Sequence, residues 1–174
     1  MEYTLDRIEA GIDVETYVED FVDVKGFLEC CKACPNYNTI WSCPPFAFHP
    51  LEYWGRYEEL MVIGYRLNFT GDRTEEEMTD ALREVKARVA EELYEMEAEY
   101  PGSISLSAGS CSLCERCTKP EGEPCRHQDR MRYSIEALGG NVGKTISELC
   151  GVEIEWIEEG KLPDHFVLVG GLLK

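Results

Sequence analysis

Apolar residues spaced three and four positions apart predict amphipathic helices in two stretches of the chain. The longer helix begins at Thr74, which forms a capping box with Glu77, and ends before Pro101-Gly102. Its apolar face is Met78, Leu82, Val85, Val89, Leu93, Met96 and Tyr100. The shorter helix follows Asp13, and its apolar face is Val14, Tyr17, Val18, Phe21 and Val22. Further short helices are expected from Asp23 to Cys31, from Met131 to Leu138 and, after an Asn141 cap, from Val142 to Cys150.

Other stretches carry the period-two pattern of β-strands. Residues 60–69 are apolar on both faces, which is typical of a buried strand, and residues 103–107 alternate as a shorter one. A strand, a long helix and a second strand form a crossover unit, so we expect these two strands to be parallel. Two later strands, 152–157 and 165–169, are expected to form an antiparallel pair.

These elements predict one α/β or α+β domain that spans residues 1–174. We expect a small mixed sheet, flanked by helices, that presents two cysteine-rich metal-binding loops at residues 30–50 and 109–130. The second loop opens directly after the 103–107 strand, and functional loops of α/β sheets gather beyond the carboxyl ends of strands. A chain of 174 residues buries roughly 70% of its unfolded surface, so it does not need a metal merely to form a core.

Charge and composition narrow the function classes. The net charge of −17 disfavours binding to nucleic acid or to anionic membrane surfaces. The first ten residues lack the apolar run of a signal peptide, and no window approaches the ~20 apolar residues of a membrane helix. We therefore expect a cytoplasmic protein. Because that compartment is reducing, nine cysteines in two tight groups favour metal ligation or redox chemistry over disulfides.

The second cysteine loop has the spacing C-x2-C-x2-C-x7-C. Its members are Cys111, Cys114, Cys117 and Cys125. Three thiolates at intervals of three suit three irons of one cubane, and a fourth cysteine returns after a turn, which predicts a [4Fe–4S] cluster. A four-cysteine zinc site is the alternative, although zinc usually takes two separated pairs. Five bases between Arg116 and Arg132, against three acids, are expected to favour thiolates here.

The first cysteine loop offers three candidate ligands, Cys31, Cys34 and Cys43, with the spacing C-x2-C-x8-C. Aromatic residues of this loop, among them Trp41 and Phe46, are expected to screen the site from water. Three cysteines leave one coordination position open. The fourth ligand is expected to be His49, water, a substrate or a distant thiol such as Cys150. A second cluster, zinc and no metal all remain open, and Cys30 is expected to be a spare thiol.

The two loops together resemble an uncharacterised family of small cysteine-rich proteins, described as predicted metal-binding proteins, from anaerobic bacteria and archaea. The resemblance covers about residues 13–173. Its motifs are Cys31-x2-Cys34-Pro35-x-Tyr37, Trp41-Ser42-Cys43-Pro44-Pro45-Phe46, Cys111-x2-Cys114-x2-Cys117, Cys125-Arg126-His127, Ser134-Ile135-Glu136-Ala137-Leu138-Gly139 and Val169-Gly170-Gly171. It implies metal binding through these seven cysteines and life in an anaerobe, and it assigns no reaction. Asn38 stands where the family pattern has glycine, and asparagine tolerates the left-handed conformation.

The sequence therefore predicts an iron–sulfur protein with a redox or electron-transfer role and a redox protein as its partner. It would hold one [4Fe–4S] cluster, or two if the first loop also binds one. The alternatives are a zinc-binding module that mediates protein contacts without catalysis, and a carrier of metal or clusters. No catalytic residue is assigned by the sequence.

Overall fold

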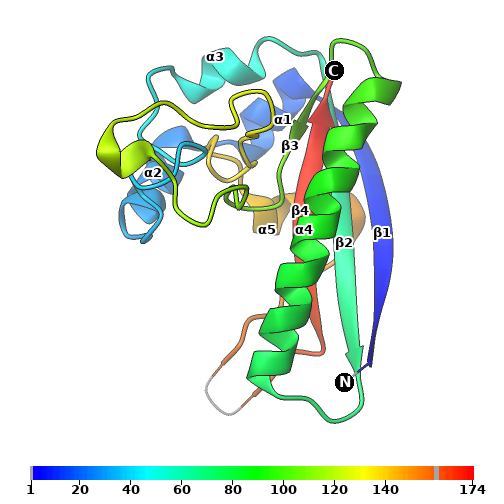
Figure 1. Ribbon diagram of the computed structural model, residues 1–174. Coiled ribbons are helices and arrows are strands. Elements are labelled where there is room, and N and C mark those ends of the chain that lie inside the picture. Colours follow the sequence, from blue (N-terminus) through cyan, green and yellow to red (C-terminus); the bar gives the residue numbers. More distant parts are fainter. Residues whose placement is uncertain (1, 159–160) are drawn as a thin grey trace.

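The computed structural model describes residues 2–158 and 161–174, and it contains a four-stranded sheet with helices packed on both faces (Figure 1). The strands are β1 (Glu2–Asp13), β2 (Glu59–Thr70), β3 (Ile104–Leu106) and β4 (His165–Leu173). Their order across the sheet is β1-β2-β4-β3, and each neighbouring pair is antiparallel. The α+β class is therefore confirmed.

The pairing of the sheet differs from the expected mixed arrangement. Strands β2 and β3 run in the same direction, as their connection through a long helix predicts, but they are not hydrogen-bonded to each other. Strand β4 inserts between them and is antiparallel to both. The C-terminal strand thus replaces the expected parallel contact with two antiparallel ones.

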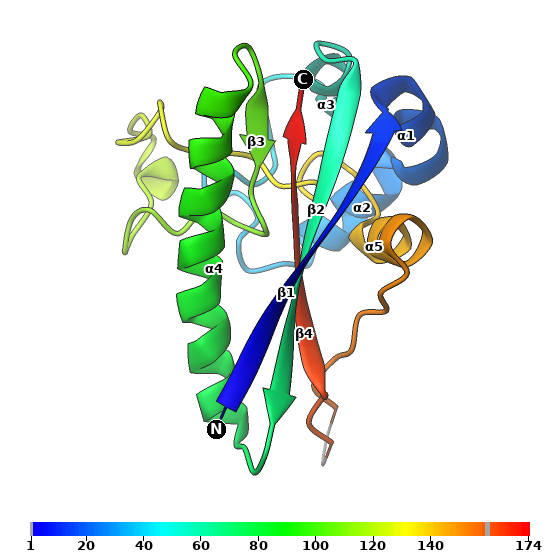
Figure 2. The ribbon, with the colours of Figure 1, turned by 90° about the vertical axis from the view of Figure 1, so that its right-hand side faces the viewer.

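Helix α4 (Glu75–Glu99) covers one face of the sheet. Thr74 and Glu77 form the expected capping box, with Glu77 N donating to Thr74 Oγ1 at 3.2 Å. Alternate side chains of β2, including Ile63 and Leu67, pack against the buried stripe of α4. Figure 2 shows α4 on one side of the sheet and the shorter helices on the other.

The opposite face is covered by α1 (Val14–Phe21), α3 (Pro50–Trp54) and α5 (Val142–Cys150). Leu60 and Val62 of β2 point to this side, and Gly64 allows the close approach of α5. A Cβ atom at Gly64 would lie 2.5 Å from Ile146 Cδ1. Helix α2 (Val24–Lys32) follows α1 and is capped by Asp23, whose Oδ1 accepts from Gly26 N at 2.9 Å.

Two expected elements do not form. Residues 131–138 form turns in place of a helix, and residues 152–157 form no strand with 165–169. The short apolar runs there pack into the core as irregular chain, so their periodicity was too brief to define an element. Strand β1, which carries many charged residues, was not predicted at all. Within the described residues, no helix is both long enough and apolar enough to cross a membrane.

Candidate metal centre

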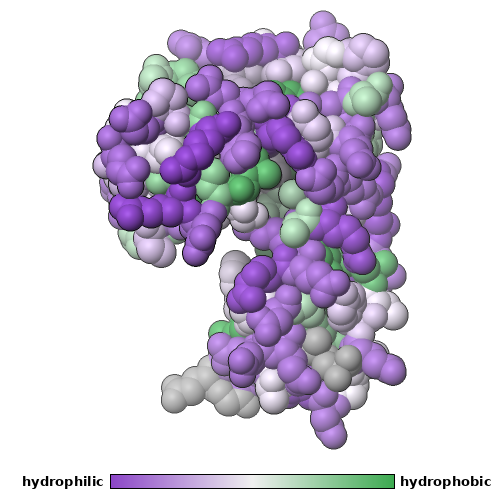
Figure 3. Space-filling view, in the orientation of Figure 1, coloured by the Kyte–Doolittle hydropathy of each residue, from purple (hydrophilic) through white to green (hydrophobic). Residues whose placement is uncertain are grey.

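The two cysteine loops, residues 30–50 and 109–130, form one lobe beside the sheet (Figure 1). The first begins within α2, which carries Cys30 and Cys31, and the second follows β3. Gly109 opens the second loop with a φ of 81°, a conformation that favours glycine. The surface on this side is hollowed below the lobe (Figure 3). The fold thus brings into contact residues that are 69 and 77 positions apart in sequence.

Ser42 joins the two loops at the cysteines themselves. Its side chain is buried, with 1% exposed, and its hydroxyl accepts a hydrogen bond from the backbone N–H of Cys111 at 3.0 Å. The same hydroxyl lies 3.9 Å from Cys43 Sγ and can donate to it. One serine thus touches a predicted ligand from each loop.

Lys119 and Trp41 form a second clamp between the loops. Lys119 Nζ, from the second loop, donates to the backbone oxygens of Cys43 at 2.7 Å and Pro45 at 3.1 Å. It also lies 5.5 Å from the centre of the Trp41 ring. Trp41 Nε1 in turn donates to Thr118 Oγ1 at 3.2 Å. Because these contacts are made by protein atoms alone, they hold the loops together independently of any metal.

The cysteines of the second loop are each partly buried. Burial raises the pKa of the Cys111 thiol. The neighbouring thiols of Cys125, Cys114 and Cys117 add to that rise, whereas a hydrogen bond from the backbone N–H of Leu113 lowers the pKa. The other three thiols of the loop therefore lie near Cys111. His127 contributes its backbone N–H, which lies 3.4 Å from Cys125 Sγ.

In the first loop, Cys31 and Cys43 are partly buried, whereas Cys34 and Cys30 are exposed. Burial raises the pKa of Cys31, and the nearby Cys43 and Cys34 thiols add to that rise. Burial also raises the pKa of Cys43, while the Ser42 hydrogen bond and the Lys119 charge lower it. The turn between the ligands contains Asn38 with a φ of 58°, so the left-handed conformation expected at this position is confirmed.

A cavity of about 140 Å³ is bordered by all three predicted ligands of the first loop. A second one, of about 250 Å³, shares Cys31 with it and is lined by Phe46 and Phe48. These two rings stack with centroids 4.9 Å apart. They therefore lie beside the cysteines, as expected of screening residues, whereas Trp41 is used in the clamp between the loops.

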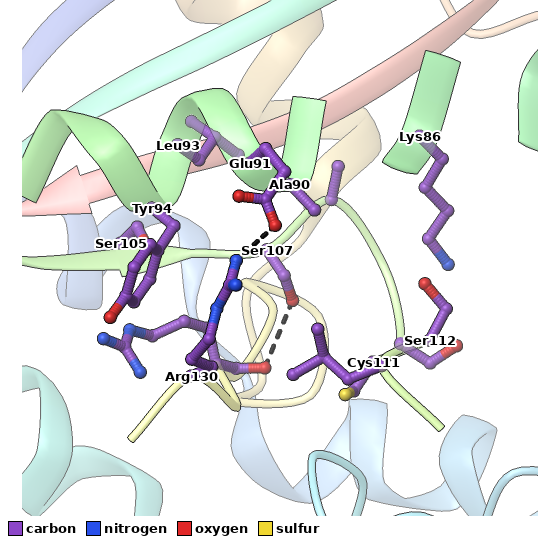
Figure 4. Close-up of a pocket in the computed structure, with 14 residues that line it drawn as sticks. Lys86, Ala90, Glu91, Leu93, Tyr94, Ser105, Ser107, Cys111, Ser112 and Arg130 are labelled. Atoms are coloured by element: carbon purple, nitrogen blue, oxygen red, sulfur yellow. Dashed lines mark hydrogen bonds and ion pairs between the residues drawn. The ribbon is translucent and has the colours of Figure 1, made fainter. Parts of the chain in front are cut away.

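The sequence suggested that the bases near the second loop favour thiolates, but two of these arginines instead pair with carboxylates on α4. Arg132 forms two hydrogen bonds with the Glu97 carboxylate on α4, at 2.7 and 2.8 Å. Arg130 pairs with Glu91 on the same helix, and both guanidinium groups stack on Tyr94. Figure 4 shows Arg130 and Glu91 beside a small cavity that Cys111 also borders. These arginines anchor the loop to α4, and it is Lys119 that acts on a thiol.

The predicted ligands thus gather in two neighbouring sets, one in each loop. As the side chains stand in the described residues, no three Cys, His, Asp or Glu groups are placed to hold one ion. Ligation therefore requires thiols to turn toward a common centre, which a cysteine achieves by rotation about one side-chain bond. The donor chemistry suits soft metals and iron–sulfur clusters. Ser42 was missed by sequence reasoning, because it belongs to no ligand spacing. Lys119 was among the five bases expected to favour thiolates, but its contact with the first loop was not foreseen.

The other proposed ligands of the first site are differently placed. His49 Nδ1 accepts from Leu51 N at 3.2 Å and caps α3, although the His49 ring also borders the 250 Å³ cavity. Cys150 ends α5 and packs against the core cluster on that face of the sheet.

Comparison with known proteins identifies the family of the chain. The family model described as "Predicted metal-binding protein (DUF2284)" matches residues 12–173, which includes both cysteine loops. No curated protein and no solved structure matches the chain.

Proposed function

This chain belongs to the family of predicted metal-binding proteins (DUF2284), and from that premise we propose that it is an iron–sulfur protein with a redox or electron-transfer role. In this proposal the second loop binds one [4Fe–4S] cluster. The ligands are Cys111, Cys114, Cys117 and Cys125. When bound, such a cluster supplies one-electron transfer.

The observation that carries the proposal is that three further thiols of the second loop lie close enough to Cys111 to raise its pKa, and that backbone N–H donors reach two of the four sulfurs. The N–H groups of Leu113 and His127 reach the sulfurs of Cys111 and Cys125. Hydrogen bonds to ligand sulfurs stabilise the added negative charge of a reduced cluster and so help to set its potential. The C-x2-C-x2-C run can give each of three irons its own thiolate. A single tetrahedral zinc ion usually takes two separated pairs of cysteines and does not need this triplet.

The clamps between the loops favour this role over a structural zinc site. Ser42, Lys119 and Trp41 already join the loops through protein atoms, and two hydrophobic clusters support the sheet. The metal is therefore not needed to hold the fold together, unlike the ion of a small zinc module.

A second metal centre is proposed at the first loop, with Cys31, Cys34 and Cys43 as ligands. Cys34 is exposed, so this centre lies near the surface, where a redox protein partner could approach. Ser42 contacts both sets of ligands, and the two centres would be neighbours along one path of electron transfer.

The test is anaerobic purification with metal and acid-labile sulfide analysis and electron paramagnetic resonance of the reduced protein. We expect brown protein with about four or about eight irons per chain, matched by sulfide. Single Cys→Ser variants of the four second-loop ligands should lose the same four irons. Cys30→Ser is the matched control, because this exposed thiol adjoins a ligand but is not one. Colourless protein with about one or two zinc ions per chain would refute the proposal and favour the zinc module.

A further inference from the structure

The turn over residues 134–140 is fixed at both of its sides. Ser134 forms an isolated bridge with Ser107, just beyond β3, and Gly140 N donates to Ile135 O at 2.9 Å. On the other side, Gly139 has a φ of 85°, and a Cβ atom there would lie 2.7 Å from the Cα of Val24. The turn is therefore pressed against the start of α2, the helix that carries Cys31.

This turn places an acidic residue beside the first cysteine loop. Glu136 borders the 140 Å³ cavity together with Cys31, Cys34 and Cys43, and it also borders the adjoining 250 Å³ cavity. The negative charge of Glu136 adds to the rise in the pKa of both Cys31 and Cys43, so the carboxylate lies near these thiols. Glu136 thus faces the same space as the three predicted ligands.

The Glu136 side chain is partly buried, and one of its carboxylate oxygens lacks a hydrogen-bond partner. Oε2 is inaccessible to solvent and has no hydrogen-bond partner among the described residues. Burial raises the pKa of the group, whereas its own backbone N–H, the Ser134 hydroxyl and the charge of Lys86 favour the ionised form. An unpartnered buried oxygen is costly, so its presence in a residue that shares a cavity with three thiols calls for a ligand.

A metal cation accounts for all of these features. Three thiolates and one carboxylate bordering one cavity would repel each other, and a cation at their centre would replace that repulsion with attraction. Three sulfurs leave one position of a tetrahedral site open, and a carboxylate oxygen is an established ligand of zinc and iron. The alternatives weighed from sequence are less suitable, because His49 caps α3 and Cys150 packs into the core.

We propose that the Glu136 carboxylate completes the three-thiolate metal centre of the first cysteine loop. The inference rests on the proposed binding of metal by that loop and is separate from the cluster of the second loop. A carboxylate is a harder ligand than a thiolate, so this position would exchange more readily than the other three and would be where a substrate or partner ligand enters.

The test is titration of the reduced, metal-free, full-length protein with Co²⁺, whose visible absorption reports thiolate ligation and coordination number. Glu136→Gln keeps the shape of the side chain and removes the anionic oxygen. It should weaken Co²⁺ binding at the first loop by at least roughly tenfold and leave the second-loop absorption unchanged. Glu136→Cys should restore tight binding with added sulfur-to-metal absorption.

Two controls separate the ligand role from the proposed function. Glu29→Gln removes an exposed carboxylate of α2 that pairs with Lys32, and it should leave Co²⁺ binding unchanged. Cys34→Ser should abolish the first-loop absorption. If Cys34→Ser loses that absorption and Glu136→Gln binds Co²⁺ as the wild type does, only the Glu136 assignment is refuted. If Cys34→Ser binds Co²⁺ as the wild type does, the first-loop centre itself is refuted, and Glu136 with it.

Discussion

Ser42→Ala tests whether one buried hydroxyl couples the two cysteine loops. The change leaves the Cys111 N–H without its acceptor and removes the hydroxyl beside Cys43 Sγ. The Ser42 side chain is 1% exposed, so water cannot readily replace it. An unsatisfied buried donor costs about 1–3 kcal/mol, so the free energy of unfolding of the metal-free protein should fall by about that amount. For a chain of this size the midpoint temperature should then fall by about 2–12 °C.

The assay is thermal unfolding of the reduced, metal-free protein followed by circular dichroism. Ser110→Ala is the matched control, because Ser110 also bridges the loops, but it is partly exposed and its bond from Asn36 Nδ2 is longer, at 3.3 Å. We expect the control to change stability by no more than about 0.5 kcal/mol. Equal stability of Ser42→Ala and the wild type would show that the loops are not joined through this hydroxyl.

A double-mutant cycle extends the test to the second clamp. Lys119→Met removes the ammonium group that binds the backbone oxygens of Cys43 and Pro45 while keeping much of the aliphatic stem. If Ser42 and Lys119 hold the same interface, their effects should be non-additive by about 0.5 kcal/mol or more. Strict additivity would mean that the two contacts stabilise separate parts of the lobe.

Three further predictions concern pH, metal removal and packing. Burial raises the pKa of the Cys31, Cys43, Cys111 and Cys150 thiols above the ordinary value of 9.0, so the folded state holds these protons more tightly than the unfolded state. The stability of the metal-free protein should therefore be greatest below pH 9.0 and should fall as the pH rises toward the folded-state pKa. Metal binding, in contrast, should strengthen as the pH rises. Denaturant unfolding at several pH values, with and without metal, checks both, and flat pH profiles would contradict them. Chelation should preserve the far-ultraviolet circular dichroism of the sheet and α4, and loss of that signal would favour metal as a structural staple. Gly64→Ala should lower the free energy of unfolding by about 1–3 kcal/mol, because the new Cβ would clash with Ile146. Gly11→Ala is the control: its Cβ would have its nearest neighbour at 3.6 Å, so the free energy of unfolding should change by no more than about 0.5 kcal/mol. Urea unfolding measures both variants.

The sequence by itself determined the elements whose signals are local. Helix α4 follows from a long 3.6-residue period and a capping box, and both are properties of adjacent residues. The Asp23 and Asn141 caps were identified for the same reason. The spacing of the cysteines likewise nominated the ligand sets, because a short loop brings thiols three residues apart close together whatever the rest of the chain does.

Strand β1 shows why other elements were not predictable. Tyr3 and Leu5 contact the α4 side of the sheet, whereas Ile8 and Ile12 contact the opposite cluster. The covered face therefore changes midway along the strand, and no single alternation runs through it. The strand is defined by its pairing with β2, a partner more than 40 residues away in sequence.

Tertiary structure alone decided the pairing of the sheet and the surroundings of the cysteines. Strand β4 lies between β2 and β3 and is hydrogen-bonded to both. No local sequence pattern indicates which strands will be its neighbours. Ser42 contacts Cys111, which is 69 positions away in sequence, and Glu136 borders the same cavity as Cys43, which is 93 positions away. Both arrangements exist only once these segments have folded into one lobe. The sequence could nominate candidate metal ligands, since their spacing is short. The groups that contact those ligands, and the carboxylate proposed to complete their coordination, come from distant segments that only folding brings within reach.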